Sequence, residues 1–354
     1  MKKLKIVHSV YGDASGGRWQ AMLNTFDALA SKGHEGILVY GNENKNLKSE
    51  NYPKFCLNSS GFYDLLAAVK LALWLRTYRP DVVIAHSGRA VYLFKNAMFF
   101  ARIKCPVIAM NHSHNVKRTV RADGFIHITP YVGQCVAEAA KKKGIDLTKK
   151  PQAIISNLIY LPEDQPSFSE TLGEPVILGI MTRLVEYKGT HLAISAVEQL
   201  KKQKYKVKLL IAGEGEQKEA LSQQVKDLNL ENEVEFLGWI GGEDKRKFYK
   251  DIDIVMVPTM NDTQPLAILD AFAWGKPVVA SDHISVQQII RQGKNGLMAK
   301  CGNIESLAEN IAFLIEHPEK ISKVAQAGYL DAKEKYQFKI IAKHYDQFIT
   351  TLKL

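Results

Sequence analysis

The chain has 354 residues, a length that favours two domains because single domains typically hold about 100–200 residues. Hydrophobic residues make up 46% and charged residues 24%, which is typical of a packed globular protein and excludes a disordered, collagen-like or coiled-coil chain. The formal net charge of +10 is unusual, and it points to an anionic partner such as a nucleic acid, a membrane surface or a phosphorylated ligand.

The excess positive charge lies in the first half of the chain. Residues 1–170 contain 23 Lys and Arg against 13 Asp and Glu, whereas residues 171–354 contain 24 of each. This asymmetry favours two domains with different partners. The basic start has too short an apolar stretch for a signal peptide, and no run of about 18 apolar residues predicts a membrane-spanning helix. Four separated cysteines without a C-x-x-C pair predict reduced thiols, so we expect a cytoplasmic protein.

Strand-like and helix-like segments alternate through this first half. The apolar run Lys5–Val10 predicts a strand, a glycine-rich loop follows at 12–17, and apolar spacing over 19–32 predicts a helix that ends at Gly33. Further strands are predicted at 36–40, 82–85, 107–110 and 125–129, and a helix at 62–78. This alternation predicts a parallel sheet covered by helices.

The alternation starts again after a polar linker at 162–174. Strands are predicted at 176–181, 207–212, 234–237, 252–257 and 277–280, with helices between them. The last segment, about 327–354, predicts one long helix. The sequence therefore predicts two α/β domains with doubly wound sheets, the first over 1–165 and the second over 172–335. Residues 336–354 are expected to form a helix that packs back on the first domain.

The glycine-rich loop at 12–17 is the first candidate ligand site. In an open α/β sheet such a loop lies at the carboxyl end of its strand, where backbone N–H groups and the next helix N-terminus bind anions. Glycine lets a phosphate approach the backbone closely. The spacing is not G-x-G-x-x-G, so a plain turn stays an equal alternative.

A second loop, Met181–Gly189, carries two cations. Arg183 and Lys188 follow the first strand of the second domain, and a glycine comes directly after the lysine. Two cations on one strand-to-helix loop suit a diphosphate, the arginine as a two-pronged donor and the lysine as a point charge. The alternative is that both are ordinary solvated side chains.

A third loop leads into a helix whose first turn is favoured by Pro265. The N–H groups of Leu266 and Ala267 at the start of this helix are available to a phosphate. Asp262 lies just before the helix and Asp270 lies one turn inside it. A carboxylate in an apolar helix needs a hydrogen-bond partner, and a ligand hydroxyl is one such partner.

Together these features resemble the retaining glycosyltransferases of family 4, also described as glycosyl transferases group 1, of the bacterial lipopolysaccharide and surface-polysaccharide type. The resemblance implies the GT-B fold, in which two Rossmann-like doubly wound domains face each other across a cleft. The family pattern has a Gly-Gly loop after the first strand, then an arginine and a lysine in "GRL…KG", then two acids in "E-x7-E". The matching stretches are 15–17, 182–189, 262–270 and 271–280, with secondary matches at 32–35, 80–83, 106–112, 122–123, 157 and 210–215.

The sequence departs from the family pattern at the acids and beside them. Both family glutamates are aspartates here, Asp262 and Asp270, so each carboxylate is one methylene shorter. The family's Phe-Gly before the helix is Gln264-Pro265, and its "PNG.D" element is reduced to the surroundings of Asn157. A different sugar, a shifted site or reduced activity would each explain these changes.

The resemblance also implies a role for each matched residue. Arg183 and Lys188 hold the diphosphate, Asp262 contacts the donor sugar, and His112 faces that sugar from the first domain. Asp270 binds the ribose, and further donor contacts fall on Gly16, Gly17, Leu266, Ala267, Gly238, Trp239 and Ile240. Transfer separates a diphosphate from an oxocarbenium-like centre, so two fixed cations can stabilise the leaving group without a metal or another cofactor.

The predicted function is transfer of a sugar from a nucleotide-diphosphate sugar to a hydroxyl of a glycan or lipid-linked acceptor, with retention of configuration. Lipopolysaccharide, O-antigen or capsule synthesis is the expected setting, with the acceptor held by the first domain. A GT-B nucleotide-sugar epimerase or hydrolase is the alternative. Nucleic-acid binding rests on charge alone, because no RNA- or DNA-binding motif is present.

Three shorter features keep their own alternatives. Residues 89–104 mix aromatic and basic side chains, which predicts either a core helix or a helix that contacts an anionic membrane at the cytoplasmic face of the inner membrane. Asp251–Asp253 and His112–His114 could bind a metal, although loop roles are favoured. Gly213–Gly215 is better explained as a tight turn than as a phosphate loop.

Overall fold

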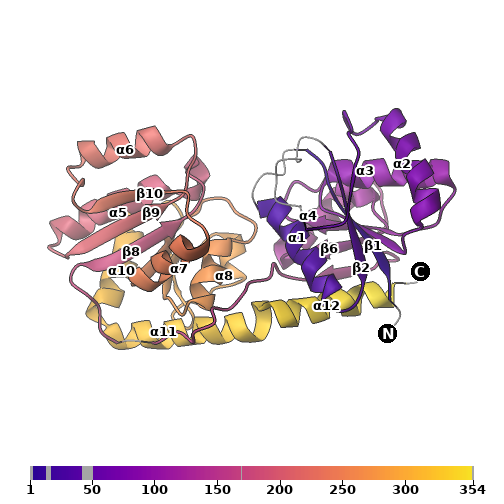
Figure 1. Cartoon of the computed structure of the whole chain (residues 1–354). Helices are drawn as coiled ribbons and strands as arrows, with labels where there is room; N and C mark the ends of the chain where they lie inside the picture. The colour runs from indigo at the N-terminus through magenta and orange to yellow at the C-terminus, as the bar shows by residue number, and fades with distance from the viewer. Residues whose placement is uncertain (1–2, 13–16, 42–50, 169, 353–354) are drawn as a thin grey trace. The chain divides into compact units, whose positions relative to one another are not determined.

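The computed structural model describes residues 3–12, 17–41, 51–168 and 170–352. Contacts divide the chain into two compact units (Figure 1), namely unit 1, Met1–Leu158 with Phe338–Leu354, and unit 2, Ile159–Gln337. Each unit holds one parallel sheet covered by helices. The prediction of two doubly wound α/β domains is therefore confirmed.

Unit 1 is built on a seven-stranded sheet with the strand order β3-β2-β1-β4-β5-β6-β7. Its strands are β1 (Lys5–Val10), β2 (Glu35–Tyr40), β3 (Lys54–Cys56), β4 (Val82–Ala85), β5 (Val107–Asn111), β6 (Gly124–His127) and β7 (Gln152–Ile154). The chain winds outward from β1 to β3 and then returns to β4 on the other side of β1. In such folds ligands bind at the carboxyl ends of the two strands where the order reverses, here β1 and β4.

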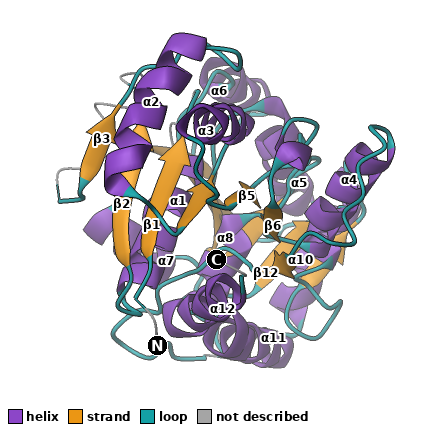
Figure 2. Ribbon diagram, turned by 90° about the vertical axis from the view of Figure 1, so that its right-hand side faces the viewer, coloured by secondary structure: helices purple, strands orange, loops and turns teal. Residues whose placement is uncertain are grey.

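Helices cover both faces of this sheet. They are α1 (Gly17–Ala30), α2 (Leu65–Tyr78), α3 (Gly88–Ala101), α4 (Pro130–Lys141) and α12 (Phe338–Thr351), with the short η2 (Thr119–Arg121). Helices α2 and α3 pack side by side (Figure 2), and α12 packs against α1. A buried pair between His34 Nε2 and Asp346 Oδ1, 2.9 Å apart, joins α12 to the turn before β2. Side chains of Asp64, Ser87 and Thr129 cap the first turns of α2, α3 and α4.

Unit 2 contains a six-stranded sheet with the strand order β10-β9-β8-β11-β12-β13. Its strands are β8 (Val176–Met181), β9 (Val207–Ala212), β10 (Val234–Gly238), β11 (Ile254–Val257), β12 (Val278–Ser281) and β13 (Leu297–Ala299). Its helices are α5 (Thr190–Lys202), α6 (Lys218–Asp227), α7 (Gly242–Asp251), α8 (Leu266–Ala273), α9 (Ile284–Gln287), α10 (Ile304–Glu316) and α11 (Pro318–Asp331), with the short η3 (Glu186–Lys188) and η4 (Ala332–Tyr336). Two apolar cores flank the sheet, one with α5 and α10 and one with α7 and α8. The strand order reverses between β8 and β11.

Some boundaries differ from the sequence expectation for physical reasons. The strands β3, β7 and β13 were not predicted, because each is a three-residue edge strand too short to show a periodic pattern. The prediction of one long helix over 327–354 is wrong, because Gln337 has an extended backbone (φ −65°, ψ 152°) and separates η4 from α12. Unit 1 ends at Leu158 rather than at 165, since the Ile159 N–H donates to the Tyr336 carbonyl at 3.0 Å inside unit 2.

Two further sequence expectations concern the thiols and the membrane. All four cysteines are free, with Cys56 and Cys301 exposed and Cys105 buried. Within the described ranges, no helix combines the length and the apolar character needed to cross a bilayer.

Candidate functional site

The loops after β8 and β11 meet at the point where the strand order of unit 2 reverses. The first loop carries Arg183 and Lys188, and the second carries Asp262. The Lys188 ammonium forms an ion pair with the Asp262 carboxylate, although 74 residues separate them in sequence. Their side chains are only 17% and 14% exposed, so the pair is largely withdrawn from water. Lys188 and Asp262, which the sequence analysis placed on separate loops, thus lie in one site.

Backbone contacts hold these two loops together. Gly189 has φ 71°, and a Cβ added there would lie 2.0 Å from the Pro258 carbonyl oxygen, so only glycine fits. The Met260 N–H donates to the Tyr187 carbonyl at 2.8 Å. The position of Lys188 is therefore set by the backbone of both loops.

Tyr187 was not predicted as a site residue. Its hydroxyl accepts a hydrogen bond from Nη2 of the exposed Arg183 at 2.8 Å, and its ring centroid lies 5.8 Å from Lys188 Nζ. An aromatic residue beside the lysine was the available signal. Tyr187 contacts both predicted phosphate-binding cations.

Helix α8 starts beside this pair, as the sequence predicted. An Asp262 oxygen accepts the Thr263 N–H at 2.8 Å, and Pro265 precedes the helix. Leu266 and Ala267 are its first two residues and are partly exposed. Their N–H groups have no acceptor within the helix, because the helix begins there.

Asp270 forms a second pair that the sequence did not predict. Its carboxylate lies 2.8 Å from Lys245 Nζ on α7. The Tyr249 hydroxyl is buried and has no hydrogen-bond partner in the described part of the chain. Burial, with a contribution from the Asp270 charge, raises the pKa of Tyr249 well above its ordinary value. The many charged residues of α7 are typical of a surface helix. The sequence therefore does not indicate that Lys245 pairs with Asp270.

The predicted donor contacts Gly238, Trp239 and Ile240 lie at the end of β10 and directly after it. Gly238 has φ 68°, and its carbonyl accepts the Gly213 N–H at 2.7 Å. Trp239 is 77% exposed, and Ile240 is half-buried. Among the described residues, no hydrogen bond or cation–π contact joins Trp239 to Arg183 or Lys188. A Cβ at Gly213 would lie 1.8 Å from the Thr182 carbonyl oxygen, so Gly213–Gly215 is a tight turn packed on the loop after β8.

The remaining predicted residues belong to unit 1. Gly16 lies outside the described residues, and Gly17 is the exposed first residue of α1. His112 directly follows β5, and its Nε2 lies 3.0 Å from His86 Nδ1. Burial, with the nearby Arg18 charge, lowers the pKa of His112 to about 4. The predicted site residues are therefore divided between the two units.

Asp251 and Asp253, which were one of the two metal-binding alternatives, have other partners. An Asp253 oxygen accepts the Ile177 N–H at 2.8 Å at the amino ends of the strands, opposite the candidate site. Asp251 pairs with Lys247 at 2.7 Å on α7. Across residues 3–12, 17–41, 51–168 and 170–352, no three His, Cys, Asp or Glu side chains are grouped so that they could hold a metal ion.

Comparison with known proteins agrees with this geometry. The family profile described as Glycosyl transferases group 1 matches residues 163–331, and that described as Glycosyltransferase Family 4 matches residues 15–143. The lipopolysaccharide core biosynthesis glycosyltransferase LpsE of Rhizobium meliloti is 25% identical over 360 residues, covering 98% of this chain and 99% of its own.

Solved structures show the same fold. Anabaena HepE, in complex with UDP and glucose, matches with a TM-score of 0.81 at 21% identity and covers 99% of this chain and 100% of its own. The lipopolysaccharide outer core galactosyltransferase WaaB matches with a TM-score of 0.69 at 17% identity, over 98% and 95% of the two chains. The two Rossmann-like units and these likenesses define the GT-B fold. The chain belongs to glycosyltransferase family 4 and is a glycosyltransferase.

Proposed function

We propose that this protein transfers a sugar from a nucleotide-diphosphate sugar to a hydroxyl of a glycan or glycolipid, with retention of configuration and without a divalent metal. The observation that carries the proposal is the Lys188–Asp262 pair at the point where the strand order of unit 2 reverses. The likeness to LpsE, a lipopolysaccharide core biosynthesis glycosyltransferase, supports lipopolysaccharide or related surface-polysaccharide synthesis as the setting. The complex of HepE with UDP and glucose supports a nucleotide-sugar donor.

The cations suit a leaving diphosphate. The Lys188 ammonium has three N–H donors, so it can keep Asp262 and still donate to phosphate oxygens. The Arg183 guanidinium has five donors, of which Tyr187 takes one. Fixed donors that face the developing negative charge stabilise the transition state more than the ground state. Leu266 and Ala267 add the positive end of α8.

A turnover assay with and without acceptor tests this proposal. We expect free nucleotide from a nucleotide sugar only when a glycan or lipid-linked acceptor is present, and we expect EDTA to leave the rate unchanged. Equal turnover without acceptor would favour the epimerase or hydrolase instead. Salt-sensitive DNA binding without nucleotide-sugar binding would favour a nucleic-acid function.

Replacing Asp270 with asparagine should weaken nucleotide binding. If the carboxylate accepts hydrogen bonds from ribose hydroxyls, its loss should raise the Kd of a nucleoside diphosphate about tenfold or more, since hydrogen bonds to charged groups contribute about 1.5–3 kcal/mol. Titration calorimetry with UDP and other nucleoside diphosphates measures this change. Asp251→Asn is the matched control, because it removes a lysine-paired carboxylate at the opposite edge of the sheet. Equal affinities for both variants would contradict the ribose role.

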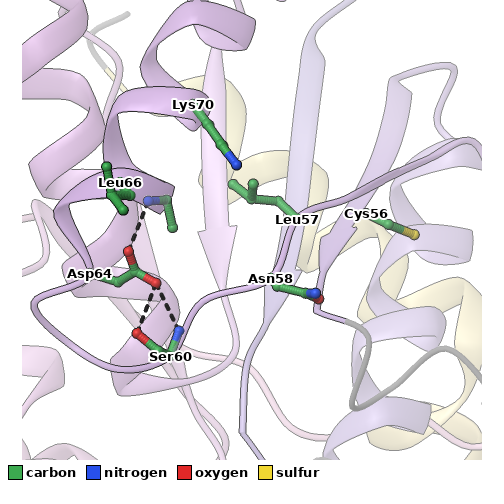
Figure 3. A pocket seen from close by; sticks show the side chains of 8 residues that line it. Cys56, Leu57, Asn58, Ser60, Asp64, Leu66 and Lys70 are labelled. Atoms are coloured by element: carbon green, nitrogen blue, oxygen red, sulfur yellow. Dashed lines mark hydrogen bonds between the residues drawn. The ribbon is translucent and has the colours of Figure 1, made fainter.

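The proposed acceptor site lies in unit 1. A pocket of about 460 Å³ opens at the carboxyl end of β3 beside the start of α2 (Figure 3). Asp64 shapes it by accepting the Ala67 N–H at 2.9 Å and the Ser60 N–H at 2.8 Å, and these bonds lower the pKa of Asp64. Lys70 lines the pocket, is exposed, and makes no ion pair with a described residue. A cation there favours an acceptor that carries an anionic group.

The proposed membrane contact is on α2 rather than on residues 89–104. Most apolar side chains of α3 are buried, and its exposed aromatic residues, Phe99 and Phe100, stand at its end. One face of α2 instead exposes an apolar stripe, which consists of Leu65, Leu66, Val69 and Leu73. Leu66 is 78% exposed and also lines the pocket. Apolar side chains beside Lys70 and Arg76 suit an interface with anionic lipid.

A double substitution in this stripe tests the contact. Leu66→Glu with Leu73→Glu should lower binding to phosphatidylglycerol vesicles by at least about 100-fold, because each leucine buried in the lipid contributes about 1.5–3 kcal/mol. Vesicle sedimentation at low salt measures it. Leu330→Glu, at an exposed leucine of unit 2, should bind like wild type. Unchanged binding of the double variant would contradict the α2 assignment, and failure of wild type to bind would favour a soluble acceptor.

A further inference from the structure

Three histidines form a row in unit 1 beside the point where its strand order reverses. His8 lies within β1, His86 directly follows β4, and His112 directly follows β5. These strands are neighbours in the sheet. The ring centroids of His8 and His86 are 6.2 Å apart, and those of His86 and His112 are 5.2 Å apart. Nothing in the family pattern assigns a role to His86.

The two facing ring nitrogens of His86 and His112 share one proton. Nδ1 of His86 lies 3.0 Å from Nε2 of His112, which is a hydrogen-bond distance. Two protonated nitrogens would repel each other, and two bare nitrogens would face lone pair to lone pair. Burial lowers the pKa of His86 well below its ordinary value, and the pKa of His112 falls to about 4. Both rings are therefore neutral near pH 7, and each carries one proton.

The other nitrogen of His86 decides where the shared proton lies. His86 Nε2 is buried and has no hydrogen-bond partner among the residues the structure describes. A buried N–H without an acceptor is rarer than a buried acceptor without a donor. His8 already places one N–H in this core, since neither of its ring nitrogens has a described partner. A second buried N–H without an acceptor, at His86 Nε2, would lower the free energy of unfolding by about 1–3 kcal/mol. The proton of His86 is therefore assigned to Nδ1, which faces His112.

We infer that His86 is a positioning residue, whose Nδ1–H donates to Nε2 of His112 and thereby makes Nδ1 the donor nitrogen of His112. A hydrogen bond to one ring nitrogen fixes both the tautomer and the orientation of an imidazole. A donor fixed in this way suits a sugar hydroxyl or an anionic oxygen of the donor substrate. The kinetic consequence rests on the proposed transfer reaction, whereas the tautomer does not.

Substitutions at His86 separate positioning from packing. His86→Leu fills similar space without a donor and should lower kcat/KM for the nucleotide sugar about tenfold, the equivalent of one hydrogen bond. His86→Asn can place an amide N–H where Nδ1 was and should stay within about threefold of wild type. His127→Leu is the matched control, because it removes a buried histidine from neighbouring β6. A loss in that control equal to the loss in His86→Leu would overturn the positioning role.

Nitrogen-15 NMR of the histidine rings gives a readout that needs no activity. In wild type we expect His112 to show a bare Nε2 and a protonated Nδ1, and in His86→Leu this pattern should change. A protonated Nε2 in wild type, or an unchanged spectrum and unchanged kcat/KM in His86→Leu, would overturn the inference. If wild type transfers no sugar, the proposed function fails while the wild-type spectrum still decides where the proton lies.

Discussion

Replacing Lys188 with alanine is expected to lower kcat/KM for sugar transfer by about 100- to 1,000-fold, the usual effect of removing one fixed donor to a developing anion. Lys188 is the predicted phosphate-binding cation that the structure shows paired with a second predicted site residue. Its loss removes positive charge from the place where the diphosphate would separate from the sugar. Steady-state kinetics with the nucleotide sugar and acceptor measure the change.

The same substitution should also reduce stability, and this effect can be separated from the chemical one. Asp262 is only 14% exposed, and without its partner we expect a loss of about 2 kcal/mol in the free energy of unfolding. Adding Asp262→Asn removes the unpaired charge and should restore much of that stability without restoring activity. Lys202→Ala removes an exposed lysine paired with Glu198 and should change neither quantity. Near-normal turnover in Lys188→Ala would disprove the assignment of the site.

Replacing Gly189 with alanine should destabilise unit 2 by about 3 kcal/mol or more, because two costs add. The φ of 71° places any other residue in the left-handed region, which costs about 1 kcal/mol. The new Cβ would also lie 2.0 Å from the Pro258 carbonyl oxygen, a backbone atom that cannot rotate away. Urea unfolding measures the loss. Transfer activity should fall as well, since this contact holds the loop of Lys188 against the loop of Asp262.

Gly302 provides the matched control within the same unit. Its φ is 75°, and a Cβ there would meet nothing within 4 Å. Gly302→Ala should therefore show only the conformational cost, about 1 kcal/mol. Equal destabilisation by the two substitutions would show that the contact with Pro258 is not what requires glycine at position 189.

Much of the candidate site in unit 2 could be predicted because its residues lie on strand-to-helix loops. Such loops gather at the carboxyl edge of a parallel sheet, so Arg183, Lys188 and Asp262 could be expected near one another from their places after strands. The roles of the glycine after Lys188 and of the proline before α8 could also be predicted, since each depends on the local backbone conformation. Only the tertiary structure shows that Lys188 and Asp262 form an ion pair.

Contacts between separate elements could not be predicted in this way. Lys245 reaches Asp270 from another helix, and His86 reaches His112 from another strand end. No spacing in the sequence reports which helix lies beside α8 or which strand lies beside β5. Tyr187 was missed although it is next to Lys188, because its hydroxyl matters only through its contact with Arg183.

The basic, aromatic segment 89–104 shows why composition alone cannot identify a surface. Its helix α3 is amphipathic, and both a core helix and a membrane-facing helix would have that pattern. Packing against the sheet of unit 1 buries Leu93, Phe94 and Met98, while α2 exposes Leu66 and Leu73. Which helix keeps an apolar face uncovered depends on which other elements are available to cover it.

The sequence by itself determined the two α/β domains, their winding and the loops that carry Arg183, Lys188 and Asp262, because strand and helix periodicity and loop position are local properties of the chain. It also placed the +10 charge in the first half. The tertiary structure alone decided the partners: Asp262 for Lys188, Lys245 for Asp270, His86 for His112, and the exposed stripe on α2. These depend on strand order and helix packing, which bring together residues far apart in sequence.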